Sequence, residues 1–280
     1  MRHSNICAGR NWKGLISGFW GLLFLFFVIF ALTGCDDSVF ESIADDDSYE
    51  ARIEEARIAI DDANYAGARD LLLALNADFP NTAEVLRLLA NAYAGLAGLD
   101  TFNLLEMIDL LDDQNNEGAI DMVGLVLGSA DGRLTATEIT NKLANFENAI
   151  NALASISYPT DDERVQLGIM SLNHAALTIA DIIIEDTGNT EITLTDEGLD
   201  TLYPTGTPPE FSTEATSERL TSISQDIAAI DESVDAIIRV TGADVNNDIS
   251  ESLEKFQEDI DPNGDESVTQ SELESYIDNL

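Results

Sequence analysis

Cysteine and histidine are scarce in this sequence, and their scarcity excludes several kinds of chemistry. The chain has two cysteines, Cys7 and Cys35, and two histidines, of which only His174 lies beyond the N-terminal apolar segment. Zinc sites need several Cys or His ligands, and a Ser-His-Asp triad needs a histidine, so a triad is possible only at His174. Its neighbours have helical periodicity, and we interpret it as a hydrogen-bonded or solvent-facing helix residue rather than a catalytic one. Nothing in the sequence indicates an enzyme.

Basic residues are the second shortage. Only two of the lysines, Lys142 and Lys255, lie beyond residue 34, and the chain has 13 Lys and Arg against 53 Asp and Glu. Three of the basic residues and none of the acidic ones precede residue 35, so the formal net charge is −40 for the chain and −43 from residue 35 onward. Such a charge repels nucleic acids and anionic lipid headgroups and attracts divalent cations. It is equally typical of an acidic surface adapted to high salt.

The N-terminal 35 residues have the three parts of a secretory signal. Basic residues precede an uncharged apolar run over residues 14–34, which ends in Ala-Leu-Thr-Gly before a cysteine. A cysteine in this position resembles the signal of a bacterial lipoprotein. The resemblance implies that residues 1–34 are removed and that Cys35 is diacylated on its sulfur and acylated on its new amino group. The rest of the chain would then have no internal disulfide and would carry a lipid anchor in the cell envelope.

The lipid anchor has one alternative, a transmembrane anchor. An uncleaved transmembrane segment is possible because about 20 apolar residues span a bilayer. Either anchor places the rest of the chain at a membrane, on the periplasmic or extracellular side. Asp36, the residue after the lipidated cysteine, resembles an inner-membrane retention signal of some bacteria, and the choice between inner and outer membrane stays open.

Beyond Cys35 the sequence predicts an all-α protein. Residues 35–48 form a short acidic tether. Apolar residues then recur at helical spacing through residues 49–185 and again through residues 218–280, and the hydrophobic content of 45% is enough for a core. Residues 186–217, rich in Thr, Pro and Gly, predict an exposed loop with one short strand at 191–194. The helices that we expect cover residues 51–64, 66–76, 83–96, 101–111, 141–156, 161–184 and 217–240.

Residues 49–111 resemble tetratricopeptide repeats, which are stacked helical hairpins. The pattern departs in the first repeat, where Arg52 stands at the position of a large residue and the usual small residue falls on Ala56. The resemblance implies a helical hairpin stack that could bind a protein partner. The matching residues are Ala68, Leu72, Leu75 and Pro80 of one second helix and, at the 34-residue period, Leu86, Leu89, Ala90 and Tyr93 of the next first helix.

The one segment with recognisable site chemistry lies at residues 261–272. Its sequence, Asp-Pro-Asn-Gly-Asp-Glu-Ser-Val-Thr-Gln-Ser-Glu, resembles the 12-residue calcium loop of an EF-hand, with Val268 at the usual apolar position and apolar helical flanks. Calcium takes about six to eight oxygen ligands, so such a loop gathers carboxylates and carbonyls around one point. The resemblance implies these ligands: the side chains of Asp261, Asn263 and Asp265, the carbonyl of Ser267, Thr269 directly or through water, and both carboxylate oxygens of Glu272.

Position 6 of this loop departs from the family. EF-hands have glycine there because the turn often needs a positive φ, and Glu266 at this position costs about 1 kcal/mol. Residues 244–248 match the first three ligand positions, but Lys255 falls where Glu is needed, so we interpret them as a helix-capping turn. Residues 130–139 match only the second half of a calcium loop. They predict a degenerate, metal-free hand whose Leu134 packs beside Val268.

Together these features predict a lipid-anchored envelope protein that binds calcium and acts as a structural or protein-interaction module. A second interpretation is an accessory lipoprotein of a transport or envelope-assembly system, with tetratricopeptide-like hairpins and no functional calcium site. A third is an acid–base enzyme with paired carboxylates, such as a glycosidase, although no motif singles out a pair. We expect no nucleic-acid partner.

Overall fold

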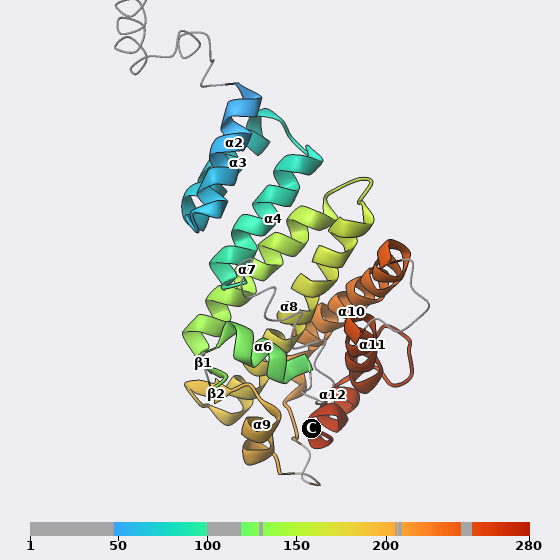
Figure 1. Cartoon of the computed structure of the whole chain (residues 1–280). Helices are drawn as coiled ribbons and strands as arrows, with labels where there is room; N and C mark the ends of the chain where they lie inside the picture. The colour runs from blue at the N-terminus through green and yellow to red at the C-terminus, as the bar shows by residue number, and fades with distance from the viewer. Residues whose placement is uncertain (1–47, 100–118, 129–130, 205, 207–208, 242–247) are drawn as a thin grey trace, which may run out of the picture. The chain divides into compact units, whose positions relative to one another are not determined.

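The computed structural model describes residues 48–99, 119–128, 131–204, 206, 209–241 and 248–280 (Figure 1). The signal segment, Cys35, most of the tether, the helix expected at 101–111 and most of the turn at 244–248 lie outside these residues. The described part contains ten helices and one two-stranded sheet, which confirms the predicted all-α hairpin stack. The elements are α2 (Tyr49–Asp61), α3 (Tyr65–Asp78), α4 (Ala83–Ala97), α6 (Ala119–Leu127), β1 (Arg133–Thr135), α7 (Ala136–Ala154), α8 (Asp161–Thr187), β2 (Glu191–Thr193), α9 (Asp196–Leu202), α10 (Thr213–Thr241), α11 (Asp248–Ile260) and α12 (Gln270–Asp278).

The first three helices pack on one another as consecutive hairpins. α3 lies against both α2 and α4, and α2 also touches α4. The Asn64 side chain caps α3 by accepting a hydrogen bond from the Gly67 amide, and α4 ends at Gly98 in the left-handed region (φ 97°). Tyr93 packs against both this small core and the main one, which joins the hairpins to the rest of the fold. The buried residues include those that the repeat pattern predicts, namely Ala56, Ala68, Leu72, Leu75, Leu86, Leu89 and Ala90.

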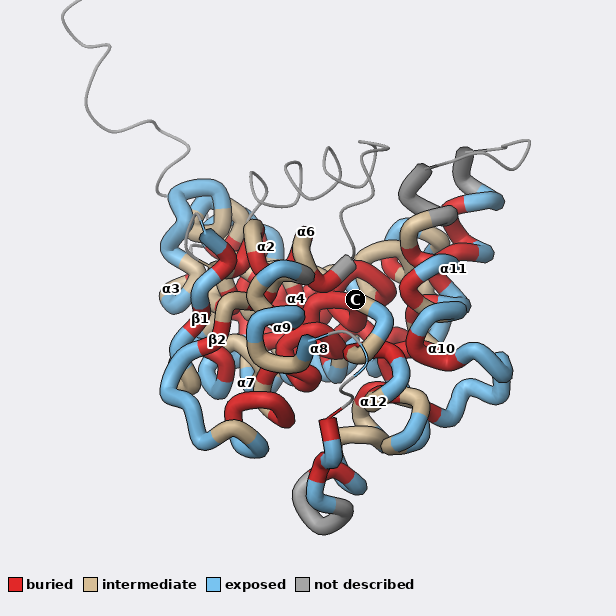
Figure 2. The backbone as a smooth tube through the Cα atoms, turned by 90° about the horizontal axis from the view of Figure 1, so that it is seen from below, coloured by how far each residue is buried: buried red, intermediate tan, exposed pale blue. Residues whose placement is uncertain are grey.

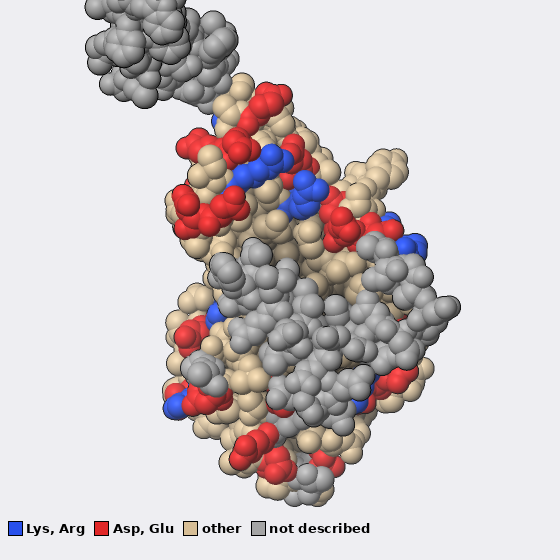
Figure 3. All heavy atoms as spheres, viewed as in Figure 1, with Lys and Arg blue, Asp and Glu red and all other residues tan. Residues whose placement is uncertain are grey.

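Polar contacts hold the outer faces of these hairpins together. Arg52 pairs with Asp78 at 2.7 Å between α2 and α3, and Arg57 pairs with Glu84 between α2 and α4. On the face seen in Figure 3, the few basic side chains of this region lie among acidic ones. Arg52, which departs from the repeat pattern, therefore serves as an ion-pair partner between two helices. Exposed pairs of this kind contribute at most about 1 kcal/mol each.

The 27-residue helix α8 forms the centre of the main core (Figure 2). It packs along α10 more extensively than any other pair of helices do, and α6 and α7 also cover it. α7 and α8 each begin with a reciprocal capping box, Thr135 with Glu138 and Thr160 with Glu163. These caps satisfy the first amides of each helix and stabilise it by about 1 kcal/mol. The carboxylate of Glu163 also lies 3.9 Å from Arg87 of α4.

Among the described residues, α8 is the one helix long and apolar enough to cross a bilayer. However, 89% of its most apolar window is buried inside the fold. Its inward-facing surface is therefore covered by other helices of the same chain, as expected of a central core helix.

A short β-ribbon joins two helical hairpins of the core. β1, which precedes α7, pairs antiparallel with β2, which follows α8, and Leu134 stands directly opposite Ile192. Both side chains are buried. The strand partner of Leu134 in the described sheet is therefore Ile192, and the packing of Leu134 beside Val268 stays a prediction. The alternation of Glu191, Ile192 and Thr193 gives β2 one apolar side for the core.

Residues 186–217 are more regular than the predicted exposed loop. The expected short strand is confirmed as β2, but α9 and the start of α10 also lie here. α9 forms because Thr195 caps it, accepting from the Gly198 amide at 3.1 Å. Leu194, Leu199 and Phe211 are each less than 5% exposed and belong to the main core. The prediction of an exposed loop was therefore wrong for these residues, because their apolar side chains are buried against the helices.

Candidate metal centre

The predicted calcium loop connects α11 to α12 in a helix–loop–helix. The flanking apolar residues expected from the sequence are buried, and the rings of Phe256 and Tyr276 meet edge to face with their centroids 6.0 Å apart. These contacts fix where α11 ends and α12 begins. The buried flanking residues are Leu253, Phe256, Ile260, Leu273, Tyr276 and Ile277.

The first ligand position is the most buried part of the loop. Asp261 is only 2% exposed, and its two carboxylate oxygens accept from the amides of Gly264 (3.2 Å) and Glu266 (2.8 Å). The backbone can fold back in this way because Gly264 and Glu266 both have left-handed φ values, 68° and 58°. Glu266 therefore adopts the conformation that glycine provides in the family, at the energetic cost expected for an L-residue.

The next two ligand positions face the same turn. The Asp265 amide donates to Asn263 Oδ1 and the Ser267 amide donates to Asp265 Oδ1, each at 2.9 Å. The other end of the Asn263 side chain donates from Nδ2 to Glu272 Oε1 at 2.6 Å, so positions 3 and 12 meet across the loop. Within the loop, Asn263 and Glu272 thus meet side chain to side chain, whereas the Asp261 and Asp265 carboxylates each face backbone amides of the turn.

Glu272 also starts α12. Its Oε2 accepts from the amide and the hydroxyl of Thr269, at 2.8 and 2.7 Å, and the Glu272 amide donates back to the Thr269 hydroxyl at 3.3 Å. This capping box uses the two side chains assigned to positions 9 and 12 of the calcium loop. An ion bound by Glu272 would therefore compete with the helix cap for the same carboxylate oxygens.

The arrangement offers oxygen donors to a hard cation. Its charge comes from four acidic residues with no basic residue in 261–272, which suits Ca²⁺ rather than a thiolate-bound or imidazole-bound metal. Among the described residues, however, no three His, Cys, Asp or Glu side chains stand together in a metal-binding cluster. The carboxylates of Asp261 and Glu272 instead face backbone amides, so an ion would have to draw them out of those hydrogen bonds.

Residues of α10 and of the preceding segment hold the loop from outside. The Val268 amide donates to the Ser224 hydroxyl of α10 at 2.9 Å. Gln270 Nε2 donates to the Phe211 carbonyl at 2.6 Å, and the Phe211 amide donates to Glu274 Oε1 at 3.1 Å. No local pattern predicts these contacts, because the partners lie 44 to 63 residues apart along the chain.

His174 lies in a buried contact with an acidic residue of another helix. Its Nδ1 is 2.7 Å from Asp226 Oδ2, between α8 and α10, and the two residues are 8% and 4% exposed. Burial raises the pKa of Asp226, while the interactions with His174 and Ser171 act in the opposite direction. His174 is therefore a hydrogen-bonded helix residue, the first of the two interpretations from the sequence, and its burial and its acidic partner are the features that the sequence did not reveal.

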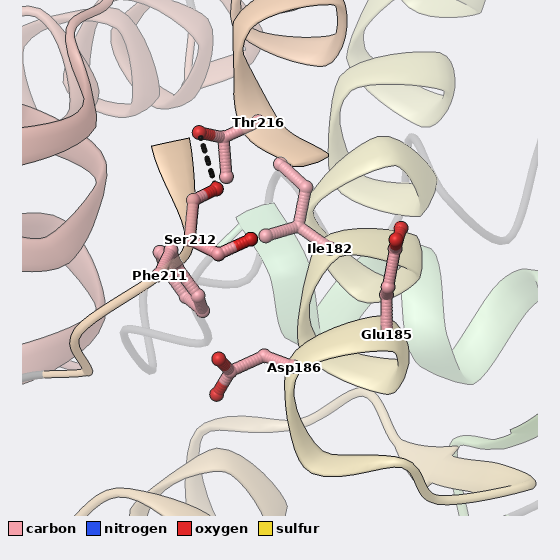
Figure 4. Close-up of a pocket in the computed structure, with 6 residues that line it drawn as sticks. All are labelled: Ile182, Glu185, Asp186, Phe211, Ser212 and Thr216. Atoms are coloured by element: carbon pink, nitrogen blue, oxygen red, sulfur yellow. Dashed lines mark hydrogen bonds between the residues drawn. The ribbon is translucent and has the colours of Figure 1, made fainter. Parts of the chain in front are cut away.

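A cavity of about 40 Å³ lies between the C-terminal part of α8 and the start of α10 (Figure 4). A space of this size holds a few water molecules at most, so it suits water rather than a sugar or peptide. The Glu185 carboxylate beside it pairs with Arg219, and Asp186 accepts from the Tyr203 hydroxyl at 2.8 Å. The cavity therefore lends no support to a carboxylate enzyme. Its lining residues are Ile182, Glu185, Asp186, Phe211, Ser212 and Thr216.

No protein-family model, no curated protein and no solved structure matches this chain. The function proposed below therefore rests on the chain's own residues.

Proposed function

We propose that this protein is a lipid-anchored component of a bacterial cell envelope that binds calcium through residues 261–272. The bound ion would stiffen the C-terminal helix–loop–helix, and the helical hairpins would serve as a structural or protein-interaction module. We propose no enzymatic activity. The N-terminal signal supports the anchor, and the oxygen-rich loop supports the ion.

The spacing of the ligand residues in one 12-residue loop, together with its backbone conformation, carries the calcium proposal. Asp261, Asn263, Asp265 and Glu272 face one turn, and positions 4 and 6 of the loop already have the left-handed backbone that the turn requires. An apolar position 8 and two buried flanking helices complete the pattern. Such a loop would need side-chain rotations of Asp261 and Glu272 to bind the ion, but no change of fold.

The helix cap sets the expected affinity. Calcium has to draw Glu272 away from Thr269 and Asn263, whose hydrogen bonds stabilise the ion-free loop. We therefore expect a dissociation constant in the range of extracellular modules, about 10⁻⁴–10⁻³ M. Calcium at ten times that constant would stabilise the fold by about 1.4 kcal/mol. This favours a structural ion over a signalling one.

Isothermal titration calorimetry of the detergent-purified protein tests the ion. We expect a single calcium-binding event at sub-millimolar to millimolar concentrations, which Glu272→Gln abolishes. Glu254→Gln removes the same charge from an exposed position on α11, outside the loop, and should bind calcium as the wild type does. Absence of binding heat in the wild type at millimolar calcium would reject the site.

Mass spectrometry of the N-terminal peptide tests the anchor. The expected N-terminal peptide begins at Cys35 and carries acyl chains. The Cys35→Ser protein should either retain its uncleaved signal segment or be released from the membrane fraction. An N-terminus at Met1 with an unmodified Cys35 would reject lipidation. Fractionation of inner and outer membranes would assign the membrane.

The accessory role in transport or envelope assembly is the second candidate. It is favoured by the hairpin stack of α2, α3 and α4, which leaves large apolar side chains at the surface. Ile58, Leu73 and Phe79 are 53%, 43% and 42% exposed. Co-purification from solubilised membranes should give a stoichiometric protein partner if this role is correct, and loss of that partner in Ile58→Ser would locate the contact.

A further inference from the structure

α12 holds the backbone of Phe211 from both sides. Gln270 and Glu274 are one helical turn apart on α12, and Gln270 Nε2 donates to Glu274 Oε1 at 2.7 Å. Gln270 also donates to the Phe211 carbonyl, and Glu274 accepts from the Phe211 amide. The two side chains thus satisfy the amide and the carbonyl of Phe211, a residue that belongs to neither strand of the described sheet. We call Gln270 and Glu274 the α12 clamp.

The clamped residue connects α12 to the end of α8. Phe211 is 4% exposed, and its ring meets that of Tyr203 edge to face with centroids 6.2 Å apart. The Tyr203 hydroxyl donates to Asp186 of α8. Phe211 also forms part of the cavity wall opposite α8 (Figure 4). If the clamp opened, this wall would lose the hydrogen bonds that hold it against α12.

The candidate metal loop sits directly before the clamp. Gln270 is the first residue of α12, and Glu272 belongs to the same turn. Residues 261–272 carry four carboxylates without a basic residue, and Glu274 adds a fifth one just beyond them. A divalent cation held by Glu272 together with Asp261, Asn263 and Asp265 would replace the Thr269 cap with ion contacts that tie the first turn of α12 to the front of the loop. The helix that carries the clamp would then be held more firmly.

We propose that calcium in the 261–272 loop tightens the α12 clamp on Phe211, so that the cavity wall opposite α8 becomes the calcium-responsive part of the fold. This inference rests on the proposed calcium site. Because coupling between two sites is reciprocal, the clamp should in turn raise the calcium affinity. The loop and the Phe211 segment would then form one thermodynamic unit across 59 residues of sequence.

Hydrogen–deuterium exchange of the detergent-purified full chain, with and without millimolar CaCl₂, tests the coupling. We expect calcium to slow exchange in peptides that cover the loop and in peptides that cover Phe211, by at least about fivefold in the latter. The double variant Gln270→Ala/Glu274→Ala should lose the effect at Phe211 and keep it in the loop. Its calcium affinity, measured by calorimetry, should fall by the same factor.

Two further variants separate the clamp from other causes. Glu274→Gln keeps an oxygen that can accept from the Phe211 amide, so it should retain the effect. Glu258→Ala removes a charge from an exposed position on α11 and should behave as the wild type. Alanine favours helices, so α12 should still form in the double variant, and its circular dichroism spectrum should show this.

The outcomes distinguish this inference from the calcium site itself. Protection of the loop by calcium without any change at Phe211 would overturn the coupling and leave the calcium site standing. Equal protection of Phe211 in the double variant would also overturn it, because the effect would not pass through the clamp. An absence of calcium binding altogether would overturn both proposals.

Discussion

Replacing Glu266 by glycine separates backbone strain from calcium affinity. Glu266 has φ 58°, a conformation that costs an L-residue about 1–2 kcal/mol. Glu266→Gly removes that cost but also a negative charge, so the matched comparison is Glu266→Gln, which removes the charge alone. Glycine also makes the unfolded chain more flexible, which offsets about 0.5–1 kcal/mol of the stability gained by removing the strain. We therefore expect the glycine variant to be more stable than the glutamine variant by about 0.5–1 kcal/mol.

The expected effect on calcium is different. The left-handed backbone at Glu266 exists in the ion-free structure, where its amide already donates to Asp261. Strain that is present both with and without the ion cancels in the binding free energy. The two variants should therefore bind calcium within about threefold of each other, or about 0.7 kcal/mol. The family preference for glycine would then reflect stability of the loop rather than its affinity.

Urea denaturation in calcium-free buffer and calorimetric titration give the two quantities. Ala63→Gly is a control for the strain term, because Ala63 has a similar φ of 56° in the turn between α2 and α3, far from the loop in sequence. It should raise stability by a similar amount and leave calcium binding unchanged. If Glu266→Gly binds calcium tenfold or more tightly than Glu266→Gln, about 1.4 kcal/mol, the loop rearranges on binding and this reasoning is refuted.

Three other substitutions test the core. Phe146→Ala should cost about 3–5 kcal/mol in urea denaturation, because Phe146 is fully buried in α7, and a loss below about 1 kcal/mol would contradict its central place. Gly124→Ala should cost about 1–3 kcal/mol or more, because the added Cβ would lie 1.8 Å from the Leu194 carbonyl oxygen; an unchanged midpoint would show that α6 does not pack against this segment. Burial raises the pKa of Asp226, so the folded state favours the protonated carboxyl. This group therefore stabilises the fold fully below its ordinary pKa, and that stability is lost as the pH rises through the raised pKa of the folded state. The stability of the wild type relative to Asp226→Asn should therefore fall with rising pH from about pH 4, and a rise would mean that the buried carboxylate is stabilised in its charged form.

Local pattern was enough to predict most of the helices and the helix–loop–helix at the C-terminal end. The spacing of Ala68, Leu72 and Leu75 determines which side of α3 is buried, and the same holds for Leu253, Phe256 and Ile260 of α11. These features depend on residues three or four positions apart, which a helix places on one face. The loop was found because its ligands lie within 12 residues.

Long-range partners were not predictable in the same way. The strand that contains Leu134 pairs with the strand of Ile192. That pairing depends on how the helical hairpins pack, and no local sequence pattern predicts this packing. α9 was missed because the Thr-rich composition of residues 186–217 masked a capping sequence, Thr195 followed by Asp196 and Glu197, that is typical of a helix start. The contact of Asp226 with His174 spans 52 residues and has no sequence signal.

The buried polar side chains of α8 have a consequence for the biogenesis of the protein. A segment of this length and hydropathy risks being retained in the bilayer while an exported chain crosses it. Asn173, His174 and Thr178 lie in the middle of the helix, where polar residues make membrane insertion less favourable. After folding, the Asn173 amide nitrogen and the Thr178 hydroxyl donate to carbonyls of their own helix, at 2.7 and 2.8 Å. In the exported protein that we propose, the same residues would let α8 pass through the membrane as an unfolded chain and be buried as a folded one.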